Sequence, residues 1–409
     1  MTPGRRDRPL KSVPLKGSNQ LTVRDVNERL VLHLIRRHGT LTKAEATRAT
    51  GLSANAVSEI FKALENDGLL LRGDPLRGRV GQPSVPMHLN PEARHYLGLK
   101  IGRRSFDMVA VDFVGGVAAR RSTSHDYPTP KGLISFIKEN LRPLLRSAKL
   151  KREDLAASGI AMPSELWHWA EEFVAPRAEL EKWRNFDVKA ELDSLLPGPI
   201  SIENDGTAAC RGELVFGPPT DKQDYIYFFV GTFIGGGVVL NGSVFPGRWG
   251  NSGGFGPLRI PDEPGGHRLI DHASLAVLER LLGEHNCDTK LLYDDSADWS
   301  ALEPVLSRWI TRASRSLAHA IVSAQAVIDF EAVIIDGALP HTIRDRLVAE
   351  VDRHFSHLDL QGVYRPEICA GHFGSIIRAL GAAAYPISND FMIDQNTLLR
   401  KEPAGQLSR

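Results

Sequence analysis

Cysteine is scarce in this 409-residue chain, and no stretch of it is long and apolar enough to indicate a membrane span. The three cysteines, Cys210, Cys287 and Cys369, stand far apart and form no pair with the spacing of metal ligands. They indicate a reducing compartment without a disulfide framework. A membrane span needs roughly 18 consecutive apolar residues, and the N-terminus lacks the apolar core of a signal peptide. We therefore expect a cytoplasmic protein without a membrane partner.

A large net charge is also missing, because 50 lysines and arginines balance 49 aspartates and glutamates. The balance hides an asymmetry: residues 1–90 hold 15 basic and 8 acidic residues, whereas residues 91–409 hold 35 and 41. A basic module joined to a larger part is the pattern expected when one part of a chain meets a phosphate backbone. Residues 1–20 are basic and lack an apolar period, so they are predicted to be a disordered arm that either adds DNA affinity or only solubilises.

The stretch from Thr42 to Pro83 is typical of a winged helix-turn-helix. A helix is predicted over residues 22–37. Thr42 and Glu45 predict a capping box at the start of a second, short helix, and Gly51 predicts the turn after it. Ser53 is expected to cap a third helix, whose apolar residues recur with the spacing of one buried face. Those apolar residues are Val57, Ile60, Phe61 and Leu64.

The third helix presents polar residues opposite its apolar stripe. Asn55, Ser58 and Lys62 are residue types that hydrogen-bond base edges and phosphates, as a recognition helix in a major groove requires. An ordinary solvated face has the same composition, so the helix alone leaves both interpretations open. Two short apolar runs around a basic tip follow it and indicate a wing, which favours DNA binding. The residues predicted to contact DNA are Ser53, Asn55, Ser58, Lys62, Arg77, Arg79 and Gln82.

Beyond residue 91, short apolar runs predict strands and longer periodic segments predict helices. Mixed sheets with interleaved helices, in two lobes, indicate an α/β body. The predicted domains are an arm over residues 1–20, a winged helix-turn-helix over 21–91 and the body over 92–409. The predicted strands cover residues 96–101, 106–112, 117–122, 157–162, 200–203, 225–230, 237–240 and 333–336, with helices over 131–148 and 206–215, between 274 and 326, and after 337.

Several short motifs follow one another along the body. They are Glu203-Asn204-Asp205, Gly231-Thr232 with Gly235-Gly236-Gly237, and the run from Gly250 to Gly256. In this order, and with the preceding head, they resemble the ROK family of repressors, open reading frames and sugar kinases, in its repressor branch. The resemblance covers nearly the whole chain. It implies a two-lobed, actin-like fold of the sugar kinase and Hsp70 type after the winged helix-turn-helix.

The first hairpin of the body departs from the pattern of the family's kinases. Those kinases have an Asp-x-Gly-Gly-Thr turn that cradles phosphates and helps to hold a metal. Here the five matching residues are Lys100-Ile101-Gly102-Arg103-Arg104. The chain thus lacks the metal-binding carboxylate, and two arginines stand where small residues let the backbone approach a nucleotide. We predict no phosphoryl transfer, no catalytic residue and no cofactor. The two arginines form either an exposed charged turn or an anion site for a phosphorylated effector.

The implied sugar pocket departs as well. The family motif has a Glu and a His that contact sugar hydroxyls, and these positions are Gly254 and Pro257 here. The cysteine-rich zinc loop is missing, so no metal is expected, although His267, Asp271 and His272 are conceivable ligands. The effector is then an atypical sugar, or the pocket has lost its ligand. The resemblance implies effector contacts by Asn204, Asp205, Asn251, Gly253 and Gly254.

Two roles remain open for the pair Asn204-Asp205. An amide beside a carboxylate can donate and accept hydrogen bonds, as recognition of adjacent hydroxyls requires. Alternatively, Asp205 only caps the helix that starts at Gly206. The resemblance favours ligand contact. The run from Gly235 to Gly237 is expected to be a turn with a structural role.

The sequence therefore predicts a sugar-responsive DNA-binding transcriptional regulator, a repressor of carbohydrate uptake or catabolism genes that a small carbohydrate effector releases. A head of this size reads few base pairs, so a homodimer or higher homo-oligomer on double-stranded, pseudo-palindromic operator DNA is expected. One alternative is a sugar kinase with an accessory DNA-binding head. Another is a constitutive DNA-binding protein with a degenerate, ligand-free body.

The wing leads to a first test. Replacing Arg77 and Arg79 by alanine should weaken operator binding, and each lost phosphate contact should make the slope of log K against log salt shallower by about 0.9. Lost base or minor-groove contacts would instead relax the sequence preference. Gel shifts at several salt concentrations measure both effects, with alanine at Arg142 and Arg146 of the body as control. Unchanged affinity and slope would remove the wing from the interface.

Overall fold

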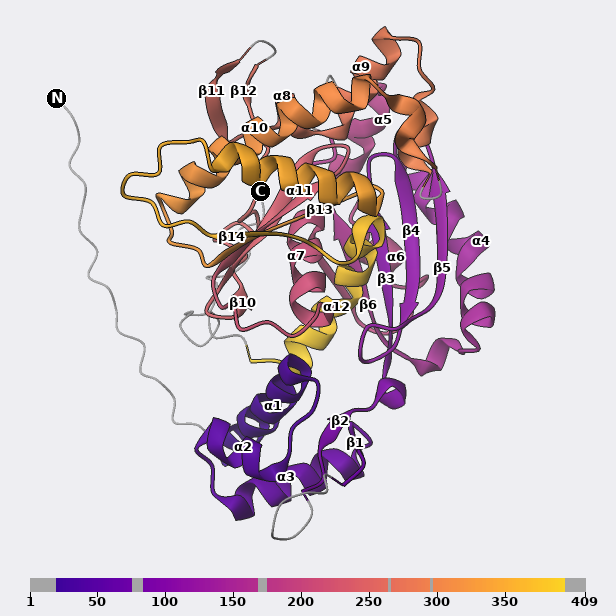
Figure 1. Cartoon of the computed structure of the whole chain (residues 1–409). Helices are drawn as coiled ribbons and strands as arrows, with labels where there is room; N and C mark the ends of the chain where they lie inside the picture. Colours follow the sequence, from indigo (N-terminus) through magenta and orange to yellow (C-terminus); the bar gives the residue numbers. More distant parts are fainter. Residues whose placement is uncertain (1–19, 76–83, 168–174, 264–265, 295–296, 394–409) are drawn as a thin grey trace, which may run out of the picture.

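The computed structural model describes residues 20–75, 84–167, 175–263, 266–294 and 297–393. A small head of three helices and one hairpin lies below a larger two-lobed body (Figure 1). The head consists of α1 (Gln20–His38), α2 (Lys43–Thr50), α3 (Ala54–Asn66), β1 (Leu70–Arg72) and β2 (Met87–Leu89).

Local sequence signals place the elements of the head. The Glu45 carboxylate accepts a hydrogen bond from the backbone N–H of Thr42 at 2.8 Å, and the Thr42 hydroxyl accepts one from the backbone N–H of Glu45 at 3.3 Å. Gly51 ends α2 in the left-handed region with φ +70°, where a side chain would be strained. The Ser53 hydroxyl then caps α3. The predicted capping box, turn and second cap are all confirmed, and α1 begins two residues earlier than predicted.

The first lobe is a five-stranded sheet in the order β5-β4-β3-β6-β7. Its first three strands form an antiparallel meander, and β6 and β7 then run parallel to β3. Helix α4 packs on one face of the sheet and helix α12 on the other. The elements are β3 (His95–Ile101), β4 (Ser105–Val111), β5 (Val117–Ser124), α4 (Pro130–Ala148), β6 (Leu155–Met162), α5 (Arg177–Glu181), α6 (Val188–Leu192), β7 (Ile200–Asn204), α7 (Asp205–Phe216) and α12 (Ile377–Phe391).

The second lobe repeats this topology in the order β10-β9-β8-β13-β14, again an antiparallel meander extended by two parallel strands. Its elements are β8 (Tyr225–Val230), β9 (Ile234–Leu240), β10 (Ser243–Val244), β11 (Arg259–Glu263), β12 (Gly266–Arg268), α8 (Ile270–Ala273), α9 (Leu275–Glu284), α10 (Val305–Gln325), β13 (Ala332–Gly337), α11 (His341–Phe355) and β14 (Glu367–Ala370). Short 3-10 turns cover Pro91–Ala93, Arg152–Asp154, Lys182–Asn185, Thr289–Tyr293, Trp299–Leu302 and Gly374–Ile376.

The repeated topology confirms the predicted α/β class and two lobes, but three expectations are wrong. Strand β14 follows residue 337, where only helices were predicted, because four residues are too few to show alternation. The pair β11 and β12 was missed for the same reason. The glycines from Gly235 to Gly237 lie inside β9 rather than in a turn, and the turn is formed by residues 231–233.

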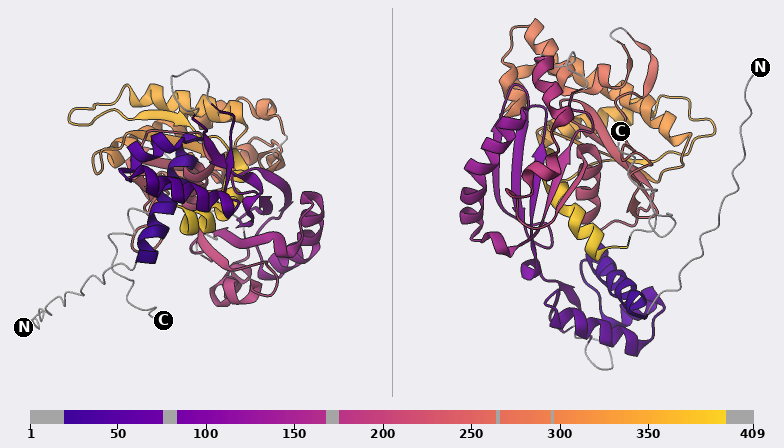
Figure 2. Two further views of the ribbon diagram at one scale, coloured as in Figure 1. Left: turned by 90° about the horizontal axis from the view of Figure 1, so that it is seen from below. Right: turned by 180° about the vertical axis from the view of Figure 1, so that it is seen from behind.

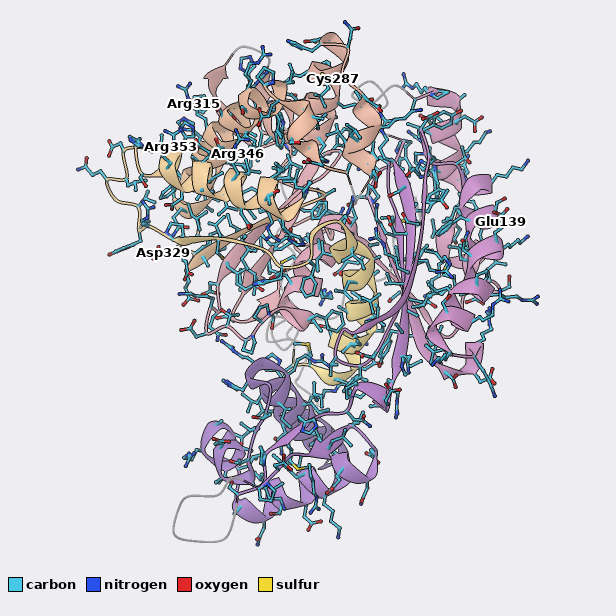
Figure 3. The ribbon with its side chains drawn as sticks, turned by 45° about the vertical axis from the view of Figure 1, so that its right-hand side comes forward. Glu139, Cys287, Arg315, Asp329, Arg346 and Arg353 are labelled. Carbon is cyan, nitrogen blue, oxygen red and sulfur yellow. The ribbon has the colours of Figure 1, made fainter. Side chains whose placement is uncertain are left out.

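Charged side chains occupy the outer helices. Glu139 on α4 lies on the far side of the first lobe, while Arg346 and Arg353 point outward from α11 (Figure 3). Arg346 pairs with Glu303 at 2.6 Å on this exposed surface. Cys287 lies at the end of the second lobe away from the head, and all three cysteines are free.

The head joins the body where α1 meets the end of α12, which the view from behind shows (Figure 2). One hydrophobic cluster contains residues of both parts, including Phe61 in the head and Phe113 in the body. The Arg36 guanidinium of α1 lies 4.9 Å from the centre of the Phe113 ring and donates a hydrogen bond to the Phe113 carbonyl at 2.8 Å. The Phe391 ring packs edge-on against Phe113 at 5.1 Å. The junction is thus built around one buried phenylalanine.

Truncating that ring tests the junction. Phe113 is fully buried, so Phe113→Ala should lower the free energy of unfolding by about 3 to 5 kcal/mol. Urea unfolding measures this loss. Phe245→Ala is the matched control, because Phe245 is 36% exposed and its loss should cost far less. Equal effects of the two substitutions would contradict the role of Phe113.

Candidate functional site

The candidate DNA-reading face belongs to α3, which lies at the end of the head farthest from the body (Figure 1). Asn55 and Lys62 are exposed and Ser58 is half-buried, while the opposite face of the helix packs into the head. The Ser53 hydroxyl is already engaged as the cap of α3, accepting from the Ala56 N–H at 3.2 Å. Arg77, Arg79 and Gln82 lie outside the described residues.

One contact at this face was missed by the sequence reasoning. Arg72 of β1 binds both carboxylate oxygens of Glu65 of α3, at 2.5 and 2.8 Å. The pair fixes the start of the wing hairpin to the end of the candidate recognition helix. Glu65 lies on the helix and Arg72 on the following strand, so no periodicity within a single element indicates their contact.

The five residues predicted to contact an effector line one cleft of 210 Å³. Asn204 and Asp205 reach it from the junction of β7 and α7, and Asn251, Gly253 and Gly254 reach it from the loop between β10 and β11. The first lobe adds Arg103 and the second adds Phe233, so the cleft lies between the lobes. The structure therefore gathers residues that are up to 50 positions apart into one place.

The sequence left open whether Asp205 caps the helix that follows it, and the structure assigns the cap to Asn204 instead. Asn204 is the cap of α7, because its side-chain oxygen accepts from the backbone N–H groups of Gly206 at 2.9 Å and Thr207 at 3.3 Å. Its amide nitrogen donates to the Ser164 hydroxyl at 3.0 Å. Asp205 begins the helix and pairs with Arg378 of α12 at 3.3 Å. The alternative in which Asp205 caps the helix is therefore wrong. The Asp205 carboxylate and its partner Arg378 both line the cleft.

Glycines allow three backbones to meet at the wall of this cleft. A Cβ atom on Gly206 would lie 2.7 Å from the backbone of Gly236, and one on Gly253 would lie 2.5 Å from the Cα of Gly237. The start of α7, strand β9 and the loop at Gly253 thus pack without side chains between them. The glycine run of β9 has the structural role that the sequence indicated, although in a strand.

One alternative held that Arg103 and Arg104 form an exposed charged turn. The structure contradicts it, because both residues are half-buried. Arg104 binds both carboxylate oxygens of Glu279 of α9 at 3.0 Å, which links the two lobes. The Arg103 guanidinium lies 4.3 Å from the centre of the Phe233 ring in the second lobe. Arg103 also lines the cleft. The turn is half-buried between the lobes, and an anion site there stays a prediction.

Lys100, next to this turn, is almost completely buried and has local partners. Its ammonium donates to Asp107 at 2.7 Å and to Ser105 at 2.6 Å, and Arg120 donates to the other Asp107 oxygen at 3.0 Å. Burial lowers the pKa of Lys100 to about 8, helped by the nearby charge of Arg378 and opposed by Asp107. Burial alone would raise the pKa of Asp107, but Lys100 and Arg120 hold it far below its usual range.

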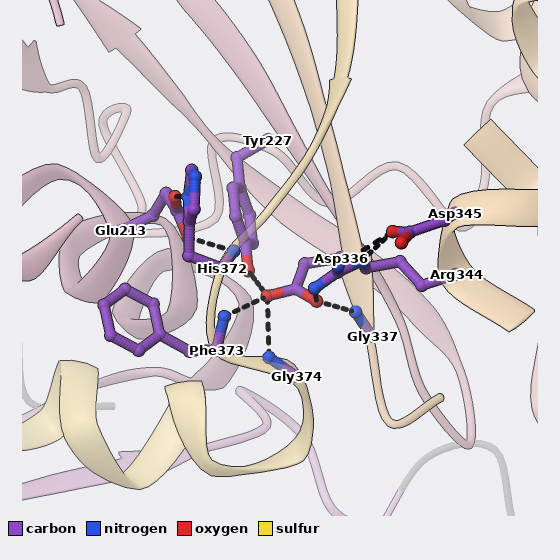
Figure 4. Close-up of polar contacts among 9 residues, drawn as sticks. All are labelled: Glu213, Tyr227, Asp336, Gly337, Arg344, Asp345, His372, Phe373 and Gly374. Atoms are coloured by element: carbon purple, nitrogen blue, oxygen red, sulfur yellow. Dashed lines mark hydrogen bonds and ion pairs between the residues drawn. The ribbon is translucent and has the colours of Figure 1, made fainter. Parts of the chain in front are cut away.

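A second buried carboxylate holds the loop after β14, as Figure 4 shows. Asp336 at the end of β13 accepts from the Tyr227 hydroxyl at 3.2 Å and from the backbone N–H groups of Phe373 at 3.3 Å and Gly374 at 3.0 Å. Next to it, His372 forms a short ion pair with Glu213 of α7. The only signal in the sequence was a charged residue at the end of an apolar strand.

The side chains considered as zinc ligands make other contacts. Asp271 pairs with Arg268 at 2.7 Å, and His272 accepts from Arg312 at 2.6 Å. Over the described ranges, no group of three or more His, Cys, Asp or Glu residues is placed to hold a metal ion. In that same part of the chain, no helix is long and apolar enough to span a membrane.

Family models match both parts of the chain. The model of the ROK family matches residues 96–387, and a model of winged helix-turn-helix DNA-binding domains matches residues 24–70. The uncharacterized protein y4fQ of Sinorhizobium fredii is 24% identical over 367 residues, which are 90% of this chain and 92% of y4fQ. The xylose repressor of Bacillus subtilis is 23% identical over 243 residues, 59% of this chain and 62% of the repressor. The Escherichia coli regulator NagC is 23% identical over 252 residues, 60% of each chain.

Solved structures support the fold. A ROK family transcriptional regulator, a homolog of the Escherichia coli MLC protein, superposes with a TM-score of 0.62 at 16% identity, covering 90% of this chain and 96% of its own. The ROK hexokinase of Thermus thermophilus gives 0.51 at 23% identity, covering 71% and 97%. At 90% coverage the first match extends beyond the body into the head. The predicted family and fold class are confirmed.

The pair of His372 and Glu213 predicts a pH dependence. The hydrogen bond to Glu213 raises the pKa of His372 above its usual value near 6.5, against the effect of burial. The contribution of the pair to stability is therefore complete below about pH 6.5 and is lost as the pH rises through the folded-state pKa. Unfolding of His372→Gln should show a larger loss of stability at pH 6 than at pH 8.5. The exposed His341→Gln variant is the control, and a loss independent of pH would contradict the pairing.

Proposed function

The chain belongs to the ROK family, and from that premise we propose that it is a repressor that leaves its operator when a small carbohydrate binds between its lobes. It is a transcriptional regulator with a winged helix-turn-helix head. The carbohydrate is the proposed part. The name of the xylose repressor of Bacillus subtilis, to which this chain is similar, supports it.

One observation carries the proposal: five residues from two separate segments line a single cleft between the lobes. Asp205 offers carboxylate oxygens that accept from hydroxyl groups, and Arg378 beside it offers donors. Sugar hydroxyls both donate and accept, so the pair suits adjacent hydroxyls. The cleft suits a ligand of about one sugar ring, since it is smaller than the roughly 300 Å³ at which most ligand pockets begin.

Helix α12 offers the route from the cleft to the DNA. Arg378, in its first turn, lines the cleft, and Asn389, near its end, accepts from Arg29 of α1 at 3.0 Å. A helix of 15 residues spans about 22 Å. An effector that binds better to one arrangement of the lobes shifts the population of α12 positions and so moves the head. We propose a homodimer or higher homo-oligomer whose two heads lose the spacing of the operator half-sites.

The test uses Asp205→Asn, which keeps the size of the side chain and an acceptor for Arg378. The variant should bind the operator normally without sugar and should stay bound when sugar is added, because the charge-assisted contact to the hydroxyls is weakened. Gel shifts on the protein's own promoter region with a sugar panel measure both properties. Asp187→Asn, at the exposed cap of α6, is the control.

Three outcomes would count against the proposal. Release of Asp205→Asn at the wild-type sugar concentration would place recognition elsewhere. A lack of thermal stabilisation of the wild type by any sugar would favour a constitutive DNA-binding protein. Sugar-dependent ADP release from ATP in a coupled assay, absent from the Asp205 variant, would identify a kinase with a DNA-binding head.

A further inference from the structure

A second, larger cavity of 660 Å³ lies next to the cleft, between the head and the body. Val26 and Arg29 of α1 line it from the head. Ile202 of β7, Trp249 and Tyr385 line it from the body. Its volume falls in the range of about 300 to 1,000 Å³ that is typical of small-molecule sites.

The two cavities are neighbours with a common wall. Pro163, Ser164 and Asn204 line both of them. The wall includes the hydrogen bond from the Asn204 amide to the Ser164 hydroxyl. These groups are polar, so a ligand that passes the wall meets hydrogen-bonding partners there.

One loop also serves both cavities. Trp249 and Gly250 line the larger cavity, and the following residues Asn251, Gly253 and Gly254 line the cleft. Gly250 and Gly253 have φ of +71° and +86°, which other residues rarely adopt. The backbone of the loop is therefore shaped so that consecutive residues turn toward the two cavities.

The charged groups of the larger cavity are occupied. Arg211 binds both oxygens of Glu203, at 2.6 and 2.9 Å, and its guanidinium lies 4.9 Å from the centre of the Tyr385 ring. Arg29 donates to the Asn389 carbonyl. An uncharged ligand is thus favoured over an ionic one, since a new charge would have to compete with these partners.

Apolar surface in the same cavity is uncovered. Trp249 is 86% exposed, Val26 40% and Ile202 37%. Covering such side chains removes apolar area from water, at about 25 cal/mol per Å². A sugar ring or an aromatic aglycone fits this combination, because it offers C–H or aromatic faces to the apolar groups and oxygen atoms to the polar wall.

We propose that the cleft and the larger cavity form one site, and that the effector is a glycoside or an oligosaccharide. One sugar ring occupies the cleft at Asp205, and the aglycone or second ring lies in the larger cavity against Ile202 and Trp249. This inference rests on the proposed function and names its ligand class. It also gives the ligand direct contact with Val26 of α1, so that the second part of the ligand acts on the head itself.

Calorimetric titration of the full-length protein tests the inference. The probes are glucose, xylose and N-acetylglucosamine, each with its methyl and 4-nitrophenyl glycosides in both anomeric forms. At least one 4-nitrophenyl glycoside should bind about tenfold or more tightly than its methyl glycoside, a difference of about 1.4 kcal/mol. It should also release the operator at a correspondingly lower concentration.

Two variants test whether the tighter binding of the 4-nitrophenyl glycoside comes from the larger cavity. Ile202→Trp fills the larger cavity and should abolish the preference for the 4-nitrophenyl glycoside while leaving the affinity for the methyl glycoside. Val117→Trp is the matched control, because Val117 is 41% exposed on β5, the other edge of the same sheet. Trp249→Ala removes an exposed side chain with little risk to folding and should also reduce the preference.

The outcomes separate the two proposals. Binding of a monosaccharide or methyl glycoside without any gain from the larger group overturns this inference and leaves the proposed function standing. A gain that persists in both Ile202→Trp and Trp249→Ala overturns it as well. The absence of binding by every probe overturns the proposed function and the inference together.

Discussion

Helix α12 is packed so closely that the rest of the body depends on it. A Cβ atom on Gly381 would lie 1.7 Å from the Ala208 carbonyl oxygen of α7. On the other side, Cβ atoms on Gly98 and Gly159 would lie 1.9 and 1.8 Å from carbonyl oxygens of α12. Backbone contacts of this kind cannot be adjusted by side-chain rotation, because interiors are close-packed. Any movement of α12 must therefore be shared by α7 and by the first sheet.

This packing gives the two ends of α12 a fixed relation. At one end Arg378 pairs with Asp205 and lies 4.5 Å from the centre of the Phe229 ring of the second lobe. At the other end Phe391 packs on Phe113, which also carries Arg36 of the head. In the proposed mechanism, α12 connects the contacts at Asp205 with the contacts of α1. Contiguous packing of this kind is what a coupling between the two sites would use.

Sequence reasoning was accurate where the determining contacts are local. The buried face of α3 follows from the spacing of Val57 and Phe61, and the cap of α2 from two residues three positions apart. The sequence did not predict contacts between residues that are far apart along the chain. Arg104 and Glu279 are 175 positions apart, and Arg378 and Asp205 are 173 apart. No period or motif encodes such pairs, so neither alternative for the arginine turn included the contact of Arg104 with Glu279, and the partner of Asp205 was not foreseen.

The first hairpin of the body holds its charged residues in structural contacts. A lysine buried in β3 is costly unless its charge is met, and Asp107 on the adjacent strand meets it directly. Asp107 in turn binds Arg120 of β5, so three neighbouring strands share the network. Arg104 of the same hairpin pairs with Glu279 of the second lobe. The lobes are therefore tied together at the hairpin, one residue away from Arg103, which lines the cleft.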